Sequence, residues 1–176
     1  GDGTARAARP HRRRADRYRK RLPAFLERHG AGATPGLADP LRAIAPAIED
    51  DFASVEALPP TLMHADLHLD NVIFLATGKP CLLDWQSVSY GPGAYDVVRF
   101  LTGALHGAAG HATWPALVRR YLDALRSRGV PAADLEIIER DLPAMLRRVL
   151  AGFISGYGGR APETLLPRER AMIAQS

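Results

Sequence analysis

The sequence predicts a mainly α-helical protein with one small β-hairpin, an α+β fold class. Two observations carry this prediction. Apolar residues recur at helical spacing in both the N-terminal and the C-terminal parts of the chain. Between these parts stand two short β-prone runs that are joined by a glycine-containing turn. The length of 176 residues and the hydrophobic fraction of 47% are typical of a globular protein that buries a core.

Two helices are predicted before the hairpin. The first spans residues 14–29, where the apolar positions fall at helical spacing until a Gly-rich stretch ends them. The second spans residues 40–57, because Asp39 is typical of an N-cap and Pro40 of the first helical position. Residues 1–11 have no periodicity, and we expect them to form a flexible N-terminal segment.

The centre of the chain reads "NVIFL", "ATGKP" and "CLLDW", which predicts a hairpin within a loop-and-hairpin segment at residues 61–86. From residue 94 to residue 176 the pattern is helical again. A proline, Pro143, stands inside the last long apolar stripe, where it favours a kink. Taken together, residues 12–176 are expected to form one domain.

The charge pattern bears on partners and location. The basic run at residues 9–23 could bind nucleic acid, but it lacks the aromatic interleaving that is typical of single-strand binders and is more typical of a solvated helix face. We therefore expect no nucleic-acid partner. No apolar run reaches the roughly 20 residues of a membrane span, and no secretory signal is visible, so no membrane partner is expected. The single cysteine, Cys81, suits a reducing cytoplasm, and the expected location is cytoplasmic.

Residues 62–71, "LMHADLHLDN", crowd titratable groups into ten positions. The predicted hairpin brings Asn71, at the end of this stretch, beside Asp84, which follows the second strand. One interpretation is a single polar site. In another, the alternating residues 64, 66, 68 and 70 share one face of an extended strand and bind zinc, as in a metal-dependent hydrolase. Two observations weigh against the zinc interpretation. Leu67 and Leu69 are the only spacer residues of strand type, and the sequence has no further histidine cluster to complete a zinc site.

A resemblance then narrows the choice. The pattern His64-x-Asp66-x-x-x-x-Asn71, followed by a hairpin and Asp84, resembles the catalytic and metal-binding segments of the protein-kinase-like superfamily. More closely, "HADLHLDN" and "LLDWQSVSYGPGAYDVVRFL" resemble the group of aminoglycoside phosphotransferases and choline and ecdysteroid kinases. The resemblance covers about residues 60–105. It implies a kinase-like C-terminal lobe and a small-molecule kinase that transfers the γ-phosphoryl group of ATP or GTP to a hydroxyl.

The resemblance also implies a role for each matched residue. Asp66 would be the catalytic base that orients the acceptor hydroxyl and receives its proton. Asn71 and Asp84 would bind Mg²⁺, a hard cation that prefers oxygen ligands. His64 would support the catalytic loop. Asp96 would accept hydrogen bonds from the loop, although a plain carboxylate at a helix start is an equal alternative.

Four more positions are weaker candidates. Ile73 and Leu83 would lie under the nucleotide base, and a role as ordinary hairpin core fits them equally well. His68 and Asp70 are candidates for contact with the acceptor, and surface loop positions are the alternative.

The sequence departs from the family before His64. Active members carry an N-terminal lobe there, with a phosphate-covering loop and a lysine that contacts the phosphates. The 63 residues before His64 read as helices, and neither Lys20 nor Lys79 is placed to be that lysine. The chain is therefore expected to be a C-terminal lobe, a fragment or a truncated form, whose N-terminal lobe lies upstream or on another chain. A non-catalytic binding or partner module is the alternative function.

Overall fold

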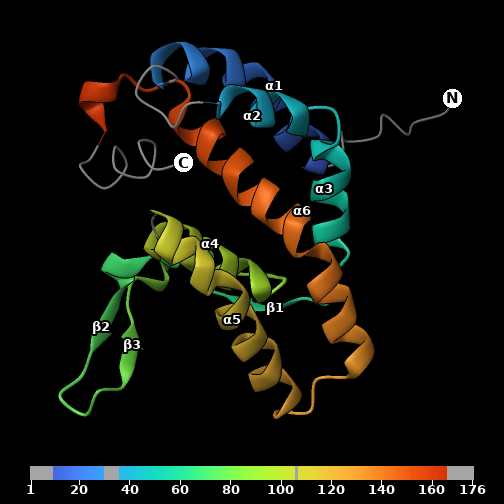
Figure 1. The fold of residues 1–176 in the computed structure, drawn as a ribbon, viewed down its shortest axis with the longest axis vertical. Coiled ribbons are helices and arrows are strands. Elements are labelled where there is room, and N and C mark those ends of the chain that lie inside the picture. The colour runs from blue at the N-terminus through green and yellow to red at the C-terminus, as the bar shows by residue number, and fades with distance from the viewer. Residues whose placement is uncertain (1–9, 30–35, 106, 166–176) are drawn as a thin grey trace, which may run out of the picture. The chain divides into compact units, whose positions relative to one another are not determined.

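The computed structural model describes residues 10–29, 36–105 and 107–165. The fold is mainly helical, with two small antiparallel sheets of two strands each, as Figure 1 shows. The mainly α class with a minor β part is confirmed. The chain divides into two compact units. The first contains the residues up to Ser54 and those from Arg147 onward, and the second is Val55–Leu146.

The first unit is helical. It contains α1 (Pro10–His29), α2 (Ala38–Ile44), most of α3 (Ile48–Glu56) and the last part of α6 (Ala132–Tyr157). A short 3-10 turn, η3 (Pro162–Thr164), follows. The buried residues of α1 recur every three or four positions, so one face of the helix packs into the core. This core is formed by Ala15, Tyr18, Leu22, Phe25, Leu41, Ile48, Phe52, Ala151, Ile154 and Leu165.

The helix predicted at residues 40–57 is in fact two helices. The chain leaves the helical state after Ile44 and re-enters it at Ile48. Pro46 stands in the break, and its missing N–H and its ring prevent a continuous helix. The predicted N-cap is also wrong: Asp39 lies inside α2, and its carboxylate is 3.1 Å from Nη1 of Arg42.

The N-terminal prediction is only partly described. Of the segment 1–11 that was expected to be flexible, residues 1–9 lie outside the described residues, while Pro10 and His11 already belong to α1. At the other end, residues 166–176 of the predicted helical region 94–176 also lie outside the described part.

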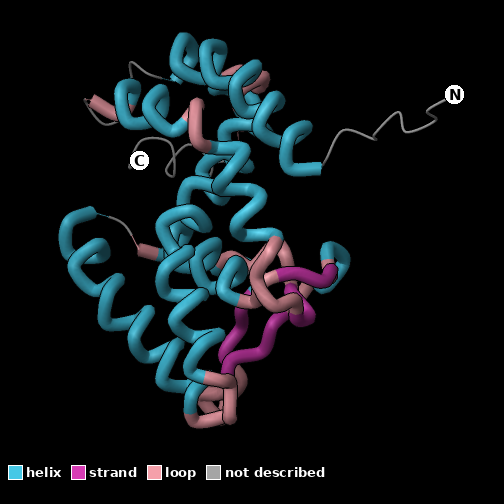
Figure 2. The backbone as a smooth tube through the Cα atoms, turned by 90° about the vertical axis from the view of Figure 1, so that its right-hand side faces the viewer, coloured by secondary structure: helices cyan, strands magenta, loops and turns pink. Residues whose placement is uncertain are grey.

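The second unit carries all four described strands. The predicted hairpin is β2 (Val72–Phe74) and β3 (Pro80–Leu82), with Ile73 opposite Cys81. A second pair, β1 (Thr61–Met63) with β4 (Ser89–Gly91), was not predicted. Figure 2 shows the strands gathered on one side of the helices of this unit.

The helices of the second unit are α4 (Ala94–Ala104), α5 (Gly107–Arg126) and the first part of α6. Pro115 and Pro143 lie inside α5 and α6. One core of the unit consists of the buried residues Leu101, Val118, Leu122 and Leu135, with partly buried neighbours from these helices and from the segments that join them. Among the described helices, none combines the length and the apolar character that a membrane crossing requires.

Candidate active site

The loop after β1 is held by the start of α4. The Asp96 carboxylate accepts the backbone N–H of His64 at Oδ2 (2.6 Å) and that of Ala65 at Oδ1 (2.9 Å). Ala65 has φ of +66°, a left-handed conformation that is uncommon for a residue with a Cβ. The two charge-assisted hydrogen bonds stabilise this backbone, and they fix the direction in which the next residue, Asp66, leaves it.

His64 links the loop to the end of the hairpin. Its side chain is buried, with 2% of the residue exposed. Nε2 donates to the carbonyl of Leu83 at 2.7 Å, because a carbonyl oxygen can only accept. Nδ1 accepts the backbone N–H of Asp66 at 3.4 Å, so the ring has its proton on Nε2. The ring also packs against that of Trp85 in a tilted arrangement, with 4.8 Å between centroids and 46° between the ring planes. These contacts are those of a scaffold residue.

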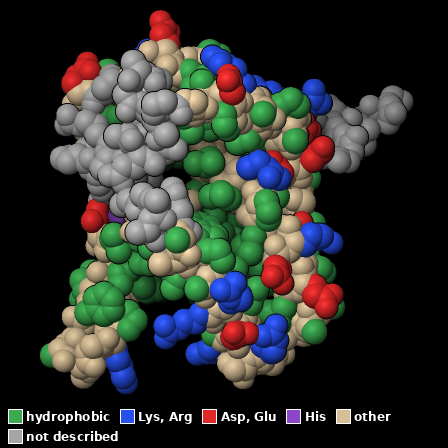
Figure 3. All heavy atoms as spheres, in the orientation of Figure 1, with side chains coloured by type: hydrophobic (Ala, Val, Ile, Leu, Met, Phe, Trp, Pro, Cys, Tyr) green, Lys and Arg blue, Asp and Glu red, His purple; other side chains and the backbone are tan. Residues whose placement is uncertain are grey.

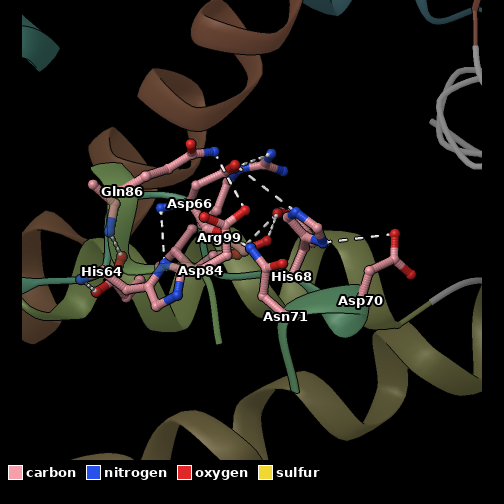
Figure 4. Close-up of polar contacts among 12 residues, drawn as sticks. His64, Asp66, His68, Asp70, Asn71, Asp84, Gln86 and Arg99 are labelled. Carbon is pink, nitrogen blue, oxygen red and sulfur yellow. Dashed lines mark hydrogen bonds and ion pairs between the residues drawn. The ribbon is translucent and has the colours of Figure 1, made fainter. Parts of the chain in front are cut away.

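Asn71 brings the loop and the hairpin together from the other side. It is buried, and its Nδ2 donates to the carbonyl of Asp66 at 3.0 Å. The backbone carbonyl of Asn71 accepts the backbone N–H of Leu83 at 2.9 Å. Asp84 follows directly, in a left-handed conformation with φ of +59°. Figure 4 shows Asp66, Asn71 and Asp84 in one small region.

The two carboxylates differ in their surroundings. Oδ1 of Asp66 lies 3.3 Å from Nη2 of Arg99, and Oδ2 lies 3.8 Å from Nε2 of His68. Asp84 is exposed, and its Oδ2 accepts Nε2 of Gln86 at 3.3 Å. Asp66 therefore has a cationic neighbour, while Asp84 faces solvent beside a neutral amide.

Arg99 is a site residue that sequence reasoning missed. It lies on α4 three positions after Asp96, which was a candidate. Residues three apart on a helix share a face, so a helix that presents Asp96 to the loop also presents residue 99. That spacing is the signal that could have found it.

Ile73 and Leu83 lie on the same face of the hairpin. Leu83 lies opposite Asn71 through a backbone hydrogen bond, and Ile73 is two positions further along β2, so the alternation of a strand puts all three on one side. Ile73 is 44% exposed and Leu83 is 40% exposed. The interpretation of these two side chains as ordinary hairpin core is therefore wrong.

His68 and Asp70 lie at the loop surface beside Asp66. Nδ1 of His68 is 3.9 Å from Oδ2 of Asp70, so one imidazole stands between the two carboxylates. The Asp70 side chain is 56% exposed and that of His68 is 20% exposed. The structure thus brings His68 close to Asp66 and leaves Asp70 further out.

The donor atoms of the site do not suit zinc. A zinc site needs three or four protein ligands. Within the described parts of the chain, no group of three or more His, Cys, Asp or Glu side chains is placed to hold a metal ion. Residues 64–70 also lack the extended strand on which the zinc interpretation depended, and His64 is already hydrogen-bonded at both ring nitrogens. The zinc interpretation is therefore not supported.

The residues do fit Mg²⁺. This cation is commonly held by one or two carboxylates together with substrate phosphates and water. The amide nitrogen of Asn71 is occupied by the Asp66 carbonyl, which leaves its Oδ1 as the available ligand atom. Asp84 supplies an exposed carboxylate, and it directly follows Leu83, whose backbone N–H is bonded to the backbone carbonyl of Asn71 across the hairpin. One carboxylate and one amide oxygen are therefore on hand.

A loop and a hairpin that carry two carboxylates and an amide oxygen are suited to the chemistry of a phosphotransferase, in which positioning and charge neutralisation dominate. The family model described as the phosphotransferase enzyme family matches residues 3–169. The chain belongs to this family, whose members are generally enzymes of that class. No curated protein and no solved structure matches the chain.

Proposed function

We propose that the protein is a kinase-like C-terminal lobe of a small-molecule kinase, in the group of aminoglycoside phosphotransferases and choline and ecdysteroid kinases. It transfers the γ-phosphoryl group of ATP or GTP to a hydroxyl of a small molecule. One observation carries this proposal. The hydrogen bonds of Asn71 and His64 join the loop of Asp66 to the hairpin end that leads into Asp84.

Asp66 acts as the base in this proposal. Its carboxylate orients the acceptor hydroxyl and takes its proton as the acceptor oxygen attacks the γ-phosphorus. The new bond joins the acceptor oxygen to phosphorus, and the bond from phosphorus to the bridging oxygen breaks. The products are the phosphorylated acceptor and ADP or GDP. The partial exposure of the Asp66 side chain, 41%, supports access by an acceptor.

Asp84 would hold Mg²⁺ with its carboxylate, and Asn71 would hold it with its side-chain amide oxygen. When bound, Mg²⁺ neutralises the charge of the phosphate oxygens. The hydrogen bond from Nδ2 of Asn71 to the Asp66 carbonyl supports this assignment, because it orients the amide oxygen away from that carbonyl.

Ile73 and Leu83 contact the nucleotide base, and an N-terminal lobe upstream or on another chain covers the same face. The exposure of Ile73 and Leu83 on this face supports the proposal. Figure 3 shows hydrophobic side chains gathered over the hairpin. Among the described residues, the exposed large hydrophobic side chains all lie between residues 62 and 90: Leu62, Leu69, Ile73, Phe74, Leu75, Leu83, Trp85, Val88 and Tyr90. A monomeric surface rarely leaves so much apolar area open without a binding role.

The same exposed residues favour a second candidate, a non-catalytic module that docks to a partner.

Before β1, the described residues form helices and turns, with no strand. Lys20 on α1 and Lys79 in the hairpin turn are both exposed. A lysine for the phosphates would then come from the proposed N-terminal lobe, and the chain alone should bind MgATP weakly. A micromolar dissociation constant for the chain alone in calorimetry would contradict this.

Transfer from radiolabelled ATP to kanamycin, choline and glucose tests the function in the full-length protein. The Asp66→Ala and Asp66→Asn variants should lose about 10²–10⁴-fold in turnover, the usual value of a general base. Asp123→Asn, an exposed change on α5, is the matched control and should keep wild-type turnover. Wild-type rates in both Asp66 variants would exclude Asp66 as the base. No transfer to any acceptor, with tight partner binding, would favour the docking module.

A further inference from the structure

The guanidinium of Arg99 reaches the proposed base from the adjacent helix, with Nη2 3.3 Å from Oδ1 of Asp66. We infer that Arg99 is a positioning residue for phosphoryl transfer. It holds Oδ1 of Asp66 so that Oδ2 is the oxygen that meets the acceptor hydroxyl. This inference rests on the proposed function, and it gives a role to a residue for which neither the sequence motif nor the family assignment supplied one.

Two residues of α4 hold the loop that carries Asp66. Asp96 and Arg99 lie one turn apart near the start of α4, and both reach the same loop. Asp96 fixes the backbone at residues 64 and 65, and Arg99 fixes the side chain of the next residue. The carboxylate of Asp66 is thus attached to one rigid element at two points, backbone and side chain. Such support holds a reacting group within a narrow range of orientations.

The two carboxylate oxygens of Asp66 have different neighbours. Arg99 occupies Oδ1, whereas Oδ2 has His68 as its neighbour at a longer distance of 3.8 Å. A base needs one oxygen within hydrogen-bond reach of the acceptor. Because Arg99 engages one oxygen only, it distinguishes the two and leaves the other for the proton transfer. In the described residues, Arg99 is the one arginine or lysine that forms an ion pair with Asp66.

The ion pair between Arg99 and Asp66 is poorly suited to a mainly structural role. The pair is a single contact between partly exposed side chains, 20% for Arg99 and 41% for Asp66. Ion pairs of this kind contribute little to folding. Loss of Arg99 should therefore alter the reaction much more than the stability of the fold.

The test compares Arg99→Met and Arg99→Lys in the full-length protein. The readouts are release of phosphate from MgATP with water as the acceptor and transfer to kanamycin, choline and glucose. Arg99→Met should lower kcat by about 10- to 100-fold, the scale of a small misplacement of a reacting group. The KM for MgATP and the midpoint of thermal unfolding should stay unchanged. Arg99→Lys keeps the charge without the planar geometry, so it should restore part of kcat.

The same substitution in the Asp66→Asn background gives the decisive comparison. If Arg99 acts through Asp66, Arg99→Met should cause no further loss once the carboxylate is gone. A structural role would lower the residual rate again. Arg126→Met, which removes an exposed pair with Asp123 on α5, is the matched control and should leave all rates unchanged.

A readout without turnover separates this inference from the proposed function. In ¹⁵N spectra of the arginine side chains, the Arg99 guanidinium should change in Asp66→Asn and stay unchanged in Asp123→Asn. Wild-type kcat in Arg99→Met, or a loss equal in the two Asp66 backgrounds, would overturn the positioning role and leave the proposed function intact. Absence of transfer and hydrolysis by the wild type would overturn the proposed function, and the positioning role with it. The spectra would then report a structural ion pair only.

Discussion

Asp96 accepts the backbone N–H of His64 at 2.6 Å, across 32 positions of the chain, and the N–H of Ala65 at 2.9 Å. A helix start thereby determines the backbone of the loop that carries Asp66. The sequence left two interpretations of Asp96: an acceptor of hydrogen bonds from the loop, or a plain carboxylate at a helix start. These two contacts favour the first interpretation.

Removal of this carboxylate should destabilise the second unit. Asp96→Ala leaves two loop N–H groups without their charged acceptor, and we expect a loss of about 2–3 kcal/mol in the free energy of unfolding. Urea denaturation measures this loss, and the amide of Ala65 should exchange with solvent faster. Asp123→Asn serves as a control on α5. Unchanged stability together with unchanged exchange at Ala65 would show that the two bonds do not hold the loop.

The metal assignment predicts a changed Mg²⁺ requirement. Asp84→Asn replaces a charged ligand with a neutral one, so half-maximal turnover should need at least about tenfold more Mg²⁺, since even outer partners of metal ligands are worth about 10–100-fold in affinity. Rates measured against free Mg²⁺ at fixed ATP give the value. An identical Mg²⁺ dependence in wild type and variant would remove Asp84 from the metal site.

Tyr18 predicts a loss of stability in alkali. Its side chain is fully buried, and this desolvation raises the pKa of Tyr18 from 10.0 to about 12. The unfolded chain therefore loses the phenol proton first. The contribution of the protonated Tyr18 phenol to the free energy of unfolding is fully present below pH 10 and is lost as the pH rises to about 12. Unfolding free energies from pH 8 to 12 should show this decline.

Tyr18→Phe isolates the effect. It removes the hydrogen bond from the hydroxyl to the carbonyl of Leu41, 2.6 Å long, at a cost of about 1 kcal/mol at neutral pH. The alkaline decline should become shallower. Burial and the charge of Asp96 raise the pKa of Tyr121 as well, so some dependence should remain. An alkaline decline as steep as that of the wild type would contradict the assignment to Tyr18.

Two glycines near the end of α6 should respond in opposite directions. A Cβ at Gly158 would lie 2.6 Å from the carbonyl oxygen of Ile154 and 2.9 Å from that of Arg21, and backbone atoms cannot easily move aside. Gly158→Ala should cost about 1–3 kcal/mol. A Cβ at Gly152 would have no atom within 4 Å apart from its chain neighbours and its own helix backbone, so Gly152→Ala should stabilise the helix by up to about 1 kcal/mol. Thermal unfolding of the pair checks both signs.

Local patterns explain what the sequence predicted about the fold. The β2–β3 hairpin follows from two adjacent β-prone runs and a glycine turn, all within a dozen residues. The pairing of β1 with β4 escaped prediction because it joins Thr61 to Gly91 through strands of three residues, too short to show a period. The break at Pro46 was predictable, since a proline inside a helical pattern usually ends the helix.

The candidate site divides in the same way. Asp66, Asn71 and Asp84 were selected from a motif and a predicted hairpin, which are local features. The contact between Arg99 and Asp66 depends on how α4 docks against the loop, and the periodicity of α4 alone does not reveal its partner. The exposure of Ile73 and Leu83 likewise depends on what covers the hairpin, which no short pattern encodes.

The left-handed backbone of Ala65 means that the site is not a property of its own segment. A residue with a Cβ at φ of +66° is disfavoured by about 1–2 kcal/mol, and no neighbour in residues 61–90 supplies the carboxylate that compensates. A synthetic peptide of residues 61–90 would contain Asp66, Asn71 and Asp84 and still lack their arrangement. The arrangement of these three side chains depends on the contacts of α4 with the loop, so it should form when that helix docks and be lost when the helix undocks.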